Sequence, residues 1–371
     1  MKVLCVVGAR PNFMKAAPVI EALRATPGFD VRLIHTGQHY DRQMSTLFFE
    51  ELGMPKPDLD LQVGSGSHGE QTGQIMIRFE PVLKQELPDM VMVFGDVNST
   101  VAAALCAAKM GIHVAHVEAG LRSFDRTMPE ELNRILTDHL SDYLFITEPS
   151  GRTNLLREGI PETKIFFVGN VMVDTLVKHR ERARGLAARE KLGLAAQSYG
   201  ILTLHRPSNV DAPETLDGIW EAVSEIAKEL PVVFPCHPRT RPHLNPLLIK
   251  LNGPNGLKEP RVIITDPLGY LEFLSLMIDA RLVLTDSGGI QEETTVLGIP
   301  CLTLRDNTER PVTIEQGTNV LVGSNRERIV AAAVKVLNGG SHEGRVPELW
   351  DGSAAKRIAQ ILKSRLAPCA S

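Results

Sequence analysis

The stretch MVMVFGDVNSTVAAALCAAKMGIHVAHV, residues 90–117, decides the fold class. It contains two short apolar runs, 90–94 and 113–117, separated by the polar turn GDVNST and a longer alanine-rich segment. Short apolar runs bounded by turn residues are typical of buried strands, and strands that alternate with helical segments form βαβ units around a parallel sheet. The stretch therefore predicts one such unit.

The same alternation runs along the whole chain and predicts six strands in each half. The expected strands are 2–7, 31–35, 90–94, 113–117, 143–146 and 165–168, then 199–204, 232–235, 261–264, 282–284, 301–304 and 320–322. We expect an α/β protein with two Rossmann-like, doubly wound parallel-sheet domains, over 1–170 and 171–352. The last segment, 353–371, reads as a helix, and whether it returns to the first domain stays open.

Bulk composition narrows the class of protein. The chain has 371 residues, of which 43% are hydrophobic and 23% charged, and its net charge is only −4. No global basic field exists to hold nucleic acid. The first apolar run, 3–7, is too short for a signal peptide, and no run is long enough to span a membrane. Five scattered cysteines without a C-x-x-C pair favour free thiols over disulfides or zinc, so we expect a cytoplasmic protein.

Unusual polar clusters follow almost every expected strand. They are GARPNFMK (8–15), TGQHYD (36–41), GDVNST (95–100), EAGLRSFDR (118–126), HRPSN (205–209), CHPR (236–239), TDP (265–267), TDSGGIQEE (285–293) and RDNTERP (305–311). Ligands bind outside the carboxyl ends of strands in open parallel sheets. Each loop alone has an ordinary interpretation as a turn or helix cap. Nine together favour a ligand site, with the two carboxyl edges facing one another across a cleft between the domains.

Ser287, Gly288 and Gly289 stand before an expected helix and are typical of a phosphate cradle, because small residues let a diphosphate approach the amides of a helix N-terminus. An ordinary N-cap, made by Ser287 or Asp286 with Glu292 and Glu293 as first-turn acids, explains the same letters equally well. Neither G-x-G-x-x-G nor the P-loop pattern follows any strand, so we expect no bound nicotinamide cofactor.

Glu130, Arg134 and Asp138 are four residues apart on the expected helix PEELNRILTDHL, and its leucines and isoleucine take another face. A solvated stripe of salt bridges is the alternative interpretation. Together, Asp96, Glu118 and Glu130 would bring several carboxylates to one cleft, enough for paired acid–base chemistry.

His205 follows the first strand of the second half and is either a structural residue or a catalytic one. A metal site made of His205, His237 and His243 is the remaining alternative. Their spacing matches no standard zinc pattern, so we expect no metal.

These runs together closely resemble the non-hydrolysing UDP-N-acetylglucosamine 2-epimerase family. The matching runs are GARPNFMKAAP, TGQH, GDVNST, HVEAGLRS, PEELNR, GNVMVDTL, LTLHRPSN, LTDSGGIQEE and RDNTERP, spread over residues 8–311 in the family's order. The resemblance implies a glycosyltransferase-B-like fold, a homodimer, and neither metal nor nicotinamide. It also implies a role in cell-surface polysaccharide biosynthesis.

The activity implied by the resemblance is inversion of carbon 2 of a UDP-sugar. UDP is eliminated to leave a 2-acetamidoglucal and is then added back. By motif, Asp96, Glu118 and Glu130 would handle protons, with the face on which each acts left open, and His205 would steady the departing UDP. The other residues implied in substrate binding are Arg10, Lys15, Gln38, Arg134, Ser287, Gly288, Gly289, Glu293 and Arg310. Among these, Glu293 would take the ribose hydroxyls.

Three departures from the family pattern keep alternatives open. The first loop reads GARPNF in place of the commoner GTRPE, a variant also seen in relatives that act on diacetamido-uronate sugars. Tyr40-Asp41 after TGQH, and CHPR where P-x-H-x-N is frequent, leave activation by a second UDP-sugar open. The alternatives to the lead are a diacetamido-uronate epimerase, a hydrolysing epimerase, a retaining glycosyltransferase and a non-enzymatic UDP-sugar sensor.

Overall fold

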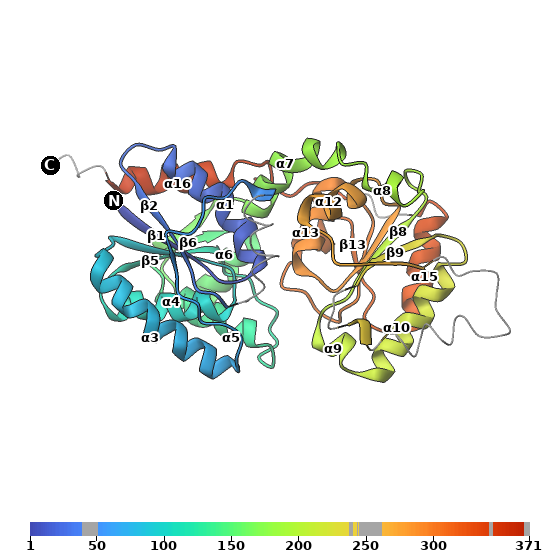
Figure 1. Ribbon diagram of the computed structural model, residues 1–371, viewed down its shortest axis with the longest axis horizontal. Coiled ribbons are helices and arrows are strands. Elements are labelled where there is room, and N and C mark those ends of the chain that lie inside the picture. Colours follow the sequence, from blue (N-terminus) through green and yellow to red (C-terminus); the bar gives the residue numbers. More distant parts are fainter. Residues whose placement is uncertain (39–50, 237–239, 243, 245–261, 341–343, 367–371) are drawn as a thin grey trace. The chain divides into compact units, whose positions relative to one another are not determined.

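The computed structural model describes residues 1–38, 51–236, 240–242, 244, 262–340 and 344–366. The chain divides into two compact units (Figure 1). The first comprises Met1–Lys178 and Glu348–Ser371, and the second His179–Pro347. The last segment of the chain thus belongs to the first unit.

Seven parallel strands form the sheet of the first unit, in the order β3-β2-β1-β4-β5-β6-β7. They are β1 (Lys2–Val7), β2 (Asp30–His35), β3 (Leu59–Asp60), β4 (Met90–Phe94), β5 (His113–Ala119), β6 (Tyr143–Ile146) and β7 (Ile165–Phe167). The strand order runs outward from β1 in both directions, which is the doubly wound arrangement. All six expected strands are present, and β3 is an addition.

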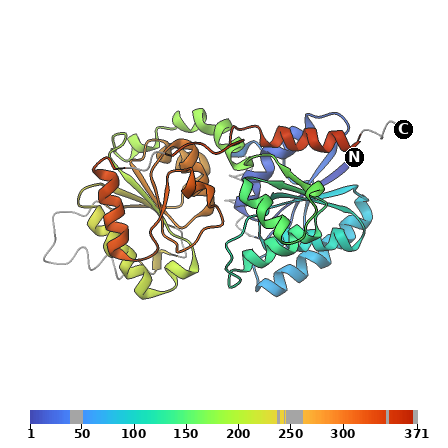
Figure 2. The same cartoon turned by 180° about the vertical axis from the view of Figure 1, so that it is seen from behind.

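Helices cover both faces of this sheet. They are α1 (Arg10–Arg24), α3 (His68–Glu86), α4 (Asn98–Lys109), α5 (Pro129–Leu140), α6 (Pro149–Arg157) and α16 (Ala354–Leu366), with a short 3-10 turn at Glu162–Lys164. Helix α7 (Val171–Arg184) begins in this unit and ends in the second. Figures 1 and 2 show α1 and α16 on one face and α3, α4 and α5 on the other. All five residues of β4 are buried, because a parallel sheet covered on both faces needs apolar side chains on both.

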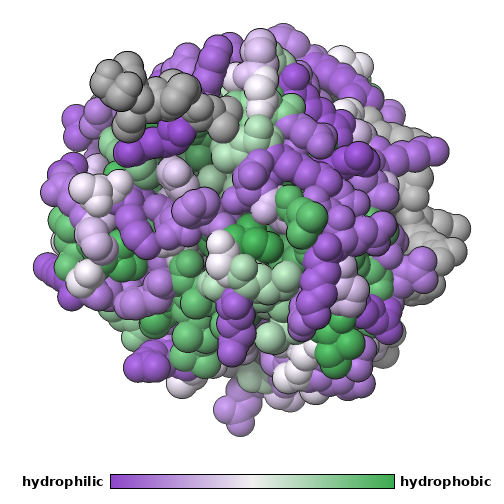
Figure 3. Space-filling model, turned by 90° about the vertical axis from the view of Figure 1, so that its left-hand side faces the viewer, coloured by the Kyte–Doolittle hydropathy of each residue, from purple (hydrophilic) through white to green (hydrophobic). Residues whose placement is uncertain are grey.

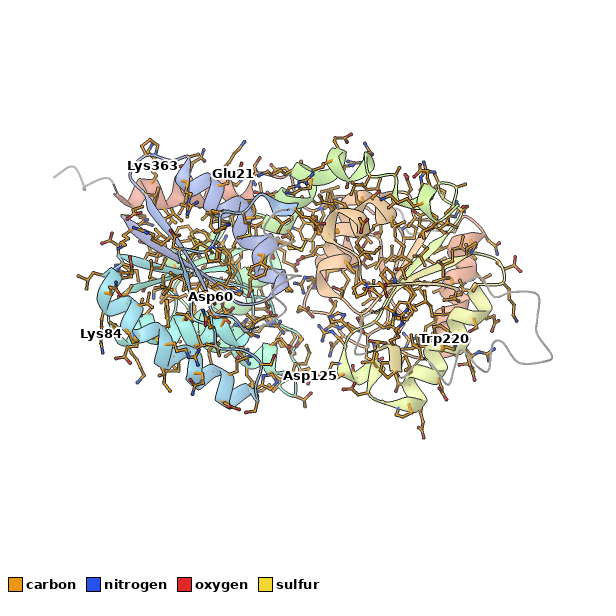
Figure 4. All side chains as sticks on the ribbon, viewed as in Figure 1. Glu21, Asp60, Lys84, Asp125, Trp220 and Lys363 are labelled. Carbon is orange, nitrogen blue, oxygen red and sulfur yellow. The ribbon has the colours of Figure 1, made fainter. Side chains whose placement is uncertain are left out.

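The C-terminal helix α16 is held in place by α1 and α7. Its side chains Ile358 and Leu362 are fully buried, and it packs against α1; Figure 4 labels Lys363 on α16 and Glu21 on α1. Asp174 of α7 accepts hydrogen bonds from the amides of Ala354 and Ala355 at 3.1 and 2.8 Å, which caps the start of α16.

The second unit has a six-stranded parallel sheet in the order β10-β9-β8-β11-β12-β13. Its strands are β8 (Gly200–Thr203), β9 (Val232–Pro235), β10 (Val262–Thr265), β11 (Leu282–Thr285), β12 (Cys301–Thr303) and β13 (Asn319–Leu321). Its helices are α8 (Ala188–Lys191), α9 (Pro207–Val210), α10 (Pro213–Ile226), α12 (Tyr270–Ile278), α13 (Gly288–Leu297), α14 (Val312–Glu315) and α15 (Arg326–Leu337). Trp220 of α10, labelled in Figure 4, joins Phe234 of β9 in the core. The expectation of two parallel α/β sheets is confirmed.

None of the described helices is long and apolar enough to cross a membrane. The cysteines at positions 5, 106, 236 and 301 are buried and free, and Cys369 lies outside the described residues. Figure 3 shows that apolar side chains interrupt the polar surface on one side of the molecule.

Candidate active site

Glu118 occupies a strained position at the end of β5. The register of β5 against β6 shifts between Val117 and Ala119, so that Glu118 is the extra residue of a β-bulge. Its φ of 75° lies in the left-handed region, which is uncommon for any residue but glycine. Bulges re-aim a side chain, and strain of this kind clusters at functional sites. The side chain it re-aims forms a buried ion pair with Lys15 of α1.

Gly95, directly after β4, makes room for this ion pair. Its φ is +64°, and a Cβ placed there would lie 2.8 Å from Lys15 Nζ and 3.5 Å from Glu118 Oε2. Asn12 of α1 donates from Nδ2 to the carbonyl of Phe94 at 2.8 Å. The start of α1 and the ends of β4 and β5 therefore converge on the Lys15–Glu118 pair.

Asp96 follows Gly95 and forms an ion pair with Arg134 of α5. The Arg134 guanidinium is only 2% exposed and also lies 2.7 Å from Glu131 Oε2. Glu131 accepts hydrogen bonds from the backbone amides of Ser123 and Phe124, both at 2.9 Å. Burial alone would raise the pKa of Glu131, but these amides and Arg134 lower it. Arg134, expected to bind substrate, thus holds Asp96 in place within the unit.

Helix α5 turns its polar side inward. Arg134 and Asp138 are buried, whereas Leu132 and Leu136 are 39% and 54% exposed. The alternative of a solvated salt-bridge stripe is therefore wrong for these two residues. Glu130 is half-buried in the first turn, and the described residues give it no hydrogen bond or ion pair. Its carboxylate is the least committed of the three candidates.

Two further expected ligands come from the ends of β1 and β2. Gln38 is buried, and its Oε1 accepts from the amide and hydroxyl of Ser99 at 3.1 and 2.6 Å. Arg10 is the first residue of α1, and its side chain lies outside the described part of the chain.

In the second unit, His205 is anchored by Asp286. The distance from His205 Nδ1 to Asp286 Oδ1 is 2.7 Å. Asp286 is fully buried and also accepts the amide of Arg206 at 2.9 Å. Burial would raise the pKa of Asp286, but the imidazole and these amides lower it. His205 itself is 57% exposed, so an oriented imidazole presents its other nitrogen outward.

The start of α13 does not fit the ordinary N-cap interpretation. Ser287 makes no side-chain capping bond, and the Asp286 carboxylate is committed to His205, Arg206 and Asn209. The first turn holds no acid, because Glu292 and Glu293 come later in the helix. The first amides of α13 thus lack the side-chain cap and the acids that the ordinary interpretation requires.

Gly288 packs against Arg310. A Cβ at Gly288 would collide with Arg310 Nη1 and lie 2.8 Å from Glu309 Oε1, so the packing at this position requires glycine. Arg310 is buried and donates from Nε to Glu292 at 2.7 Å, and it also pairs with Glu309. Gly289 is the second residue of the same helix.

Glu293 is buried beside Tyr270 of α12. The Tyr270 hydroxyl donates to Glu293 Oε1 at 2.9 Å. Burial raises the pKa of Glu293 to about 8, with Glu292 adding to the rise and the tyrosine hydrogen bond opposing it. In the free protein this carboxyl therefore holds its proton through most of the neutral range.

The candidate metal site is only partly covered by the structure. His237 and His243 lie outside the described residues. Among the residues that are described, no three His, Cys, Asp or Glu side chains group together as metal ligands would.

Known proteins match this chain over nearly its whole length. A sequence model of the UDP-N-acetylglucosamine 2-epimerase family matches residues 21–363. The chain belongs to this family.

Individual relatives agree with the family match. The UDP-N-acetylglucosamine 2-epimerase of Methanocaldococcus jannaschii is 47% identical, over 98% of this chain and 99% of its own. Its crystal structure in complex with UDP-GlcNAc and UDP superposes with a TM-score of 0.88 at 46% identity and covers 98% of this chain and 100% of its own. The UDP-2,3-diacetamido-2,3-dideoxy-D-glucuronate 2-epimerase of Pseudomonas aeruginosa is 44% identical over 98% of this chain and 99% of its own. The family inferred from the sequence motifs is confirmed.

Several residues around the epimerase-family motifs were missed by sequence reasoning. The sequence did not single out Glu131 or Tyr270, and it suggested only a helix cap for Asp286. His116 did carry one, because it is a polar residue inside the apolar strand HVAHVEA. Its ring is fully buried and contacts Asp138 and Gly95.

Proposed function

We propose that this protein catalyses the reversible epimerisation of UDP-N-acetylglucosamine (UDP-GlcNAc) to UDP-N-acetylmannosamine. The observation that carries the proposal is the strained, buried Glu118 beside Asp96, at the ends of neighbouring strands, in a chain of this family. Carboxylates concentrated in this way are costly unless they are used.

The proposed reaction is redox-neutral and needs no cofactor. A carboxylate removes the proton at C2, and the C–H electron pair forms the C1–C2 double bond. The C1–O bond breaks at the same time, and its electron pair leaves with the β-phosphate of UDP. In the second half, C2 of the 2-acetamidoglucal receives a proton on its other face while a UDP oxygen attacks C1.

The first unit supplies the proton chemistry in this proposal. Asp96, Glu118 and Glu130 are the acids and bases, and which of them serves each face stays open. Lys15 holds Glu118, and Arg134 holds Asp96, so two of the three carboxylates are fixed before substrate arrives. Arg10 and Gln38 are assigned to the sugar diphosphate by motif.

The second unit holds the nucleotide in this proposal. Ser287, Gly288 and Gly289 present helix amides to phosphate, where the helix dipole favours an anion. His205, oriented by Asp286, stabilises the charge that develops on the departing UDP. Glu293 accepts hydrogen bonds from the ribose hydroxyls. Arg310 lies against Gly288 at the start of α13, where the phosphates would bind.

A diacetamido-uronate sugar nucleotide is the second candidate substrate. The loop GARPNF and the 44% identical Pseudomonas aeruginosa relative favour it. The same elimination and re-addition would serve, because the chemistry takes place at C1 and C2 in both sugars.

We also propose a cytoplasmic homodimer that works without metal and supplies cell-surface polysaccharide biosynthesis. The buried free thiols fit a reducing compartment. Ile77 of α3 and Leu136 of α5 are 64% and 54% exposed, and apolar side chains of this kind gain from being covered by a second copy.

One experiment separates the candidates. The purified protein is incubated with UDP-GlcNAc alone, and in parallel with the diacetamido-uronate sugar nucleotide, and products are identified by NMR. A mixture of two intact UDP-sugars is expected, and the faster substrate is the physiological class. Free sugar with UDP would indicate hydrolysis, and no change with either substrate would refute the proposal.

A further inference from the structure

His116 lies at the centre of a buried chain of charged groups in the first unit. Its Nδ1 is 2.7 Å from Asp138 Oδ1, and its Nε2 is 2.8 Å from the carbonyl oxygen of Gly95. Asp138 also accepts from the amide of Gly120 at 3.1 Å and from Arg122 at 2.7 Å. Burial would raise the pKa of Asp138, but His116 and Arg122 lower it, so Asp138 is ionised. Both ring nitrogens of His116 thus face oxygen acceptors, one from a carboxylate and the other from a backbone carbonyl.

The chain of paired groups continues from Asp138 through Arg122 to Glu158. Arg122 makes a bidentate contact with Glu158, at 2.8 and 2.6 Å. Each of these four groups is therefore paired with the next; His116, Asp138 and Arg122 are buried, and Glu158 is half-buried. A complete set of partners offsets the desolvation cost of burying these charges, although an apolar set of the same volume would be as stable. The chain is thus better explained by what it orients than by stability.

The two backbone hydrogen bonds of the His116–Asp138 pair, to Gly95 and Gly120, are made close to Glu118. Gly95, Glu118 and Gly120 have φ values of 64°, 75° and 79°, so three left-handed positions surround the candidate acids. His116 holds the carbonyl of Gly95, the residue before Asp96, and Asp138 holds the amide of Gly120, two residues after Glu118.

The pair also reaches the third carboxylate through the helix. Asp138 follows Glu130 by eight residues on α5, and Arg134 lies one turn before it. The pair therefore links α5, which carries Glu130, to the ends of β4 and β5, where Asp96 and Glu118 lie.

We propose that His116, acting with Asp138, is a positioning residue for the C2 proton transfer. It keeps the Gly95–Asp96 turn and the Glu118 bulge in register without touching substrate. This inference rests on the proposed epimerase function. If the wild-type protein epimerised no UDP-sugar, the function would fail first, whereas the inference fails only in an active wild type whose variants behave normally.

The test compares two substitutions of His116 whose side-chain amides each replace a different ring nitrogen. Asparagine in His116→Asn can donate to Asp138 but is too short to reach the carbonyl of Gly95. Glutamine in His116→Gln is long enough to reach that carbonyl. A misplacement of about 1 Å can cost on the order of 100-fold in rate. We expect kcat of His116→Asn to fall roughly 10- to 100-fold and kcat of His116→Gln to fall several-fold less, with KM and UDP affinity within about threefold in both.

The kinetic isotope effect with C2-deuterated substrate separates positioning from folding. Slower proton transfer makes that step more rate-limiting, so the isotope effect on kcat should rise in His116→Asn. A smaller folded fraction would lower kcat and the UDP-binding stoichiometry together and leave the isotope effect unchanged. That outcome, or a wild-type kcat in His116→Asn, would overturn the proposal.

The same strand offers a matched control. His113 stands at the other end of β5 and pairs with Asp142 at 3.2 Å, but its side chain is 65% exposed. His113→Asn removes the same chemical group and should leave kcat and the isotope effect unchanged. Asp138→Asn is the second route if His116→Asn does not fold, and it should raise the isotope effect in the same way. A normal isotope effect in Asp138→Asn would equally contradict the proposal.

Discussion

Replacing Glu293 by glutamine should stabilise the free protein at high pH. Glu293 is buried and its pKa is raised to about 8 from 4.5. The unfolded chain therefore loses this proton at lower pH than the folded protein does. Between those two values stability falls as pH rises, because the folded state binds more protons. The cost is absent below about pH 4.5 and fully present above about pH 8.

The magnitude follows from the size of the pKa rise. A rise of about 3.5 units at 1.36 kcal/mol each sets a ceiling of about 5 kcal/mol. Relaxation and water entry reduce such costs, so we expect about 2 kcal/mol at pH 9. For a unit of this size that corresponds to a gain of about 4–8 °C in Tm. Glutamine keeps an acceptor for Tyr270, so the tyrosine hydrogen bond survives the change.

The assay is thermal unfolding of wild type and Glu293→Gln at pH 5, 7 and 9, without ligand. The gain should be near zero at pH 5 and largest at pH 9. The neighbouring Glu292 provides the control, because it is equally buried but ion-paired with Arg310 at 2.7 Å. Glu292→Gln should destabilise at every pH, since it leaves a buried guanidinium without that partner. No gain for Glu293→Gln at pH 9, or the same gain at all three pH values, would refute the reasoning.

Three other predictions concern the proposed function. Gly288→Ala should displace Arg310 and weaken UDP binding at least about tenfold, as measured by calorimetry. Gly218→Ala in α10 is the control and should leave UDP binding unchanged, because a Cβ there meets only a carbonyl 3.7 Å away. Equal UDP affinities of the two variants would contradict the phosphate-cradle assignment. Glu130→Gln should cut turnover by roughly 10²–10⁴ with little change in Tm, whereas Glu131→Gln should lower Tm because it releases the 123–124 loop; the reverse pattern would exchange their roles. Activity should survive exhaustive EDTA treatment without added NAD, and rescue by a divalent ion after its loss would contradict a metal-free reaction.

The strands could be predicted from the sequence because local patterns set them. The expected strand 2–7 coincides with β1, and 90–94 with β4. Strand β3 has only two residues, both exposed, so no apolar run marks it. The end of β5 extends past the expected residue 117, because the bulge at Glu118 re-enters the ladder at Ala119.

The orientation of side chains in the candidate site depended on partners far away in the sequence. Helix α5 was located correctly, but its sequence left open whether the face with Arg134 and Asp138 is a solvated stripe or part of the site. Arg134 and Asp138 are buried, because Asp96 in the turn after β4 and His116 on β5 pair with them. Asp286 resembled a helix cap, and its partner His205 lies 81 residues earlier in the chain. Periodicity reports local contacts and carries no information on such pairings.

Deuterium incorporation tests the central claim most directly. If Asp96, Glu118 and Glu130 remove and return the C2 proton, the original hydrogen is lost to exchangeable groups. The protein is incubated with UDP-GlcNAc in D₂O, and the recovered sugar nucleotides are analysed by NMR and mass spectrometry. We predict one deuterium at C2 of the epimerised product, with none at C3. Epimerised product that retains protium at C2 would contradict elimination and re-addition.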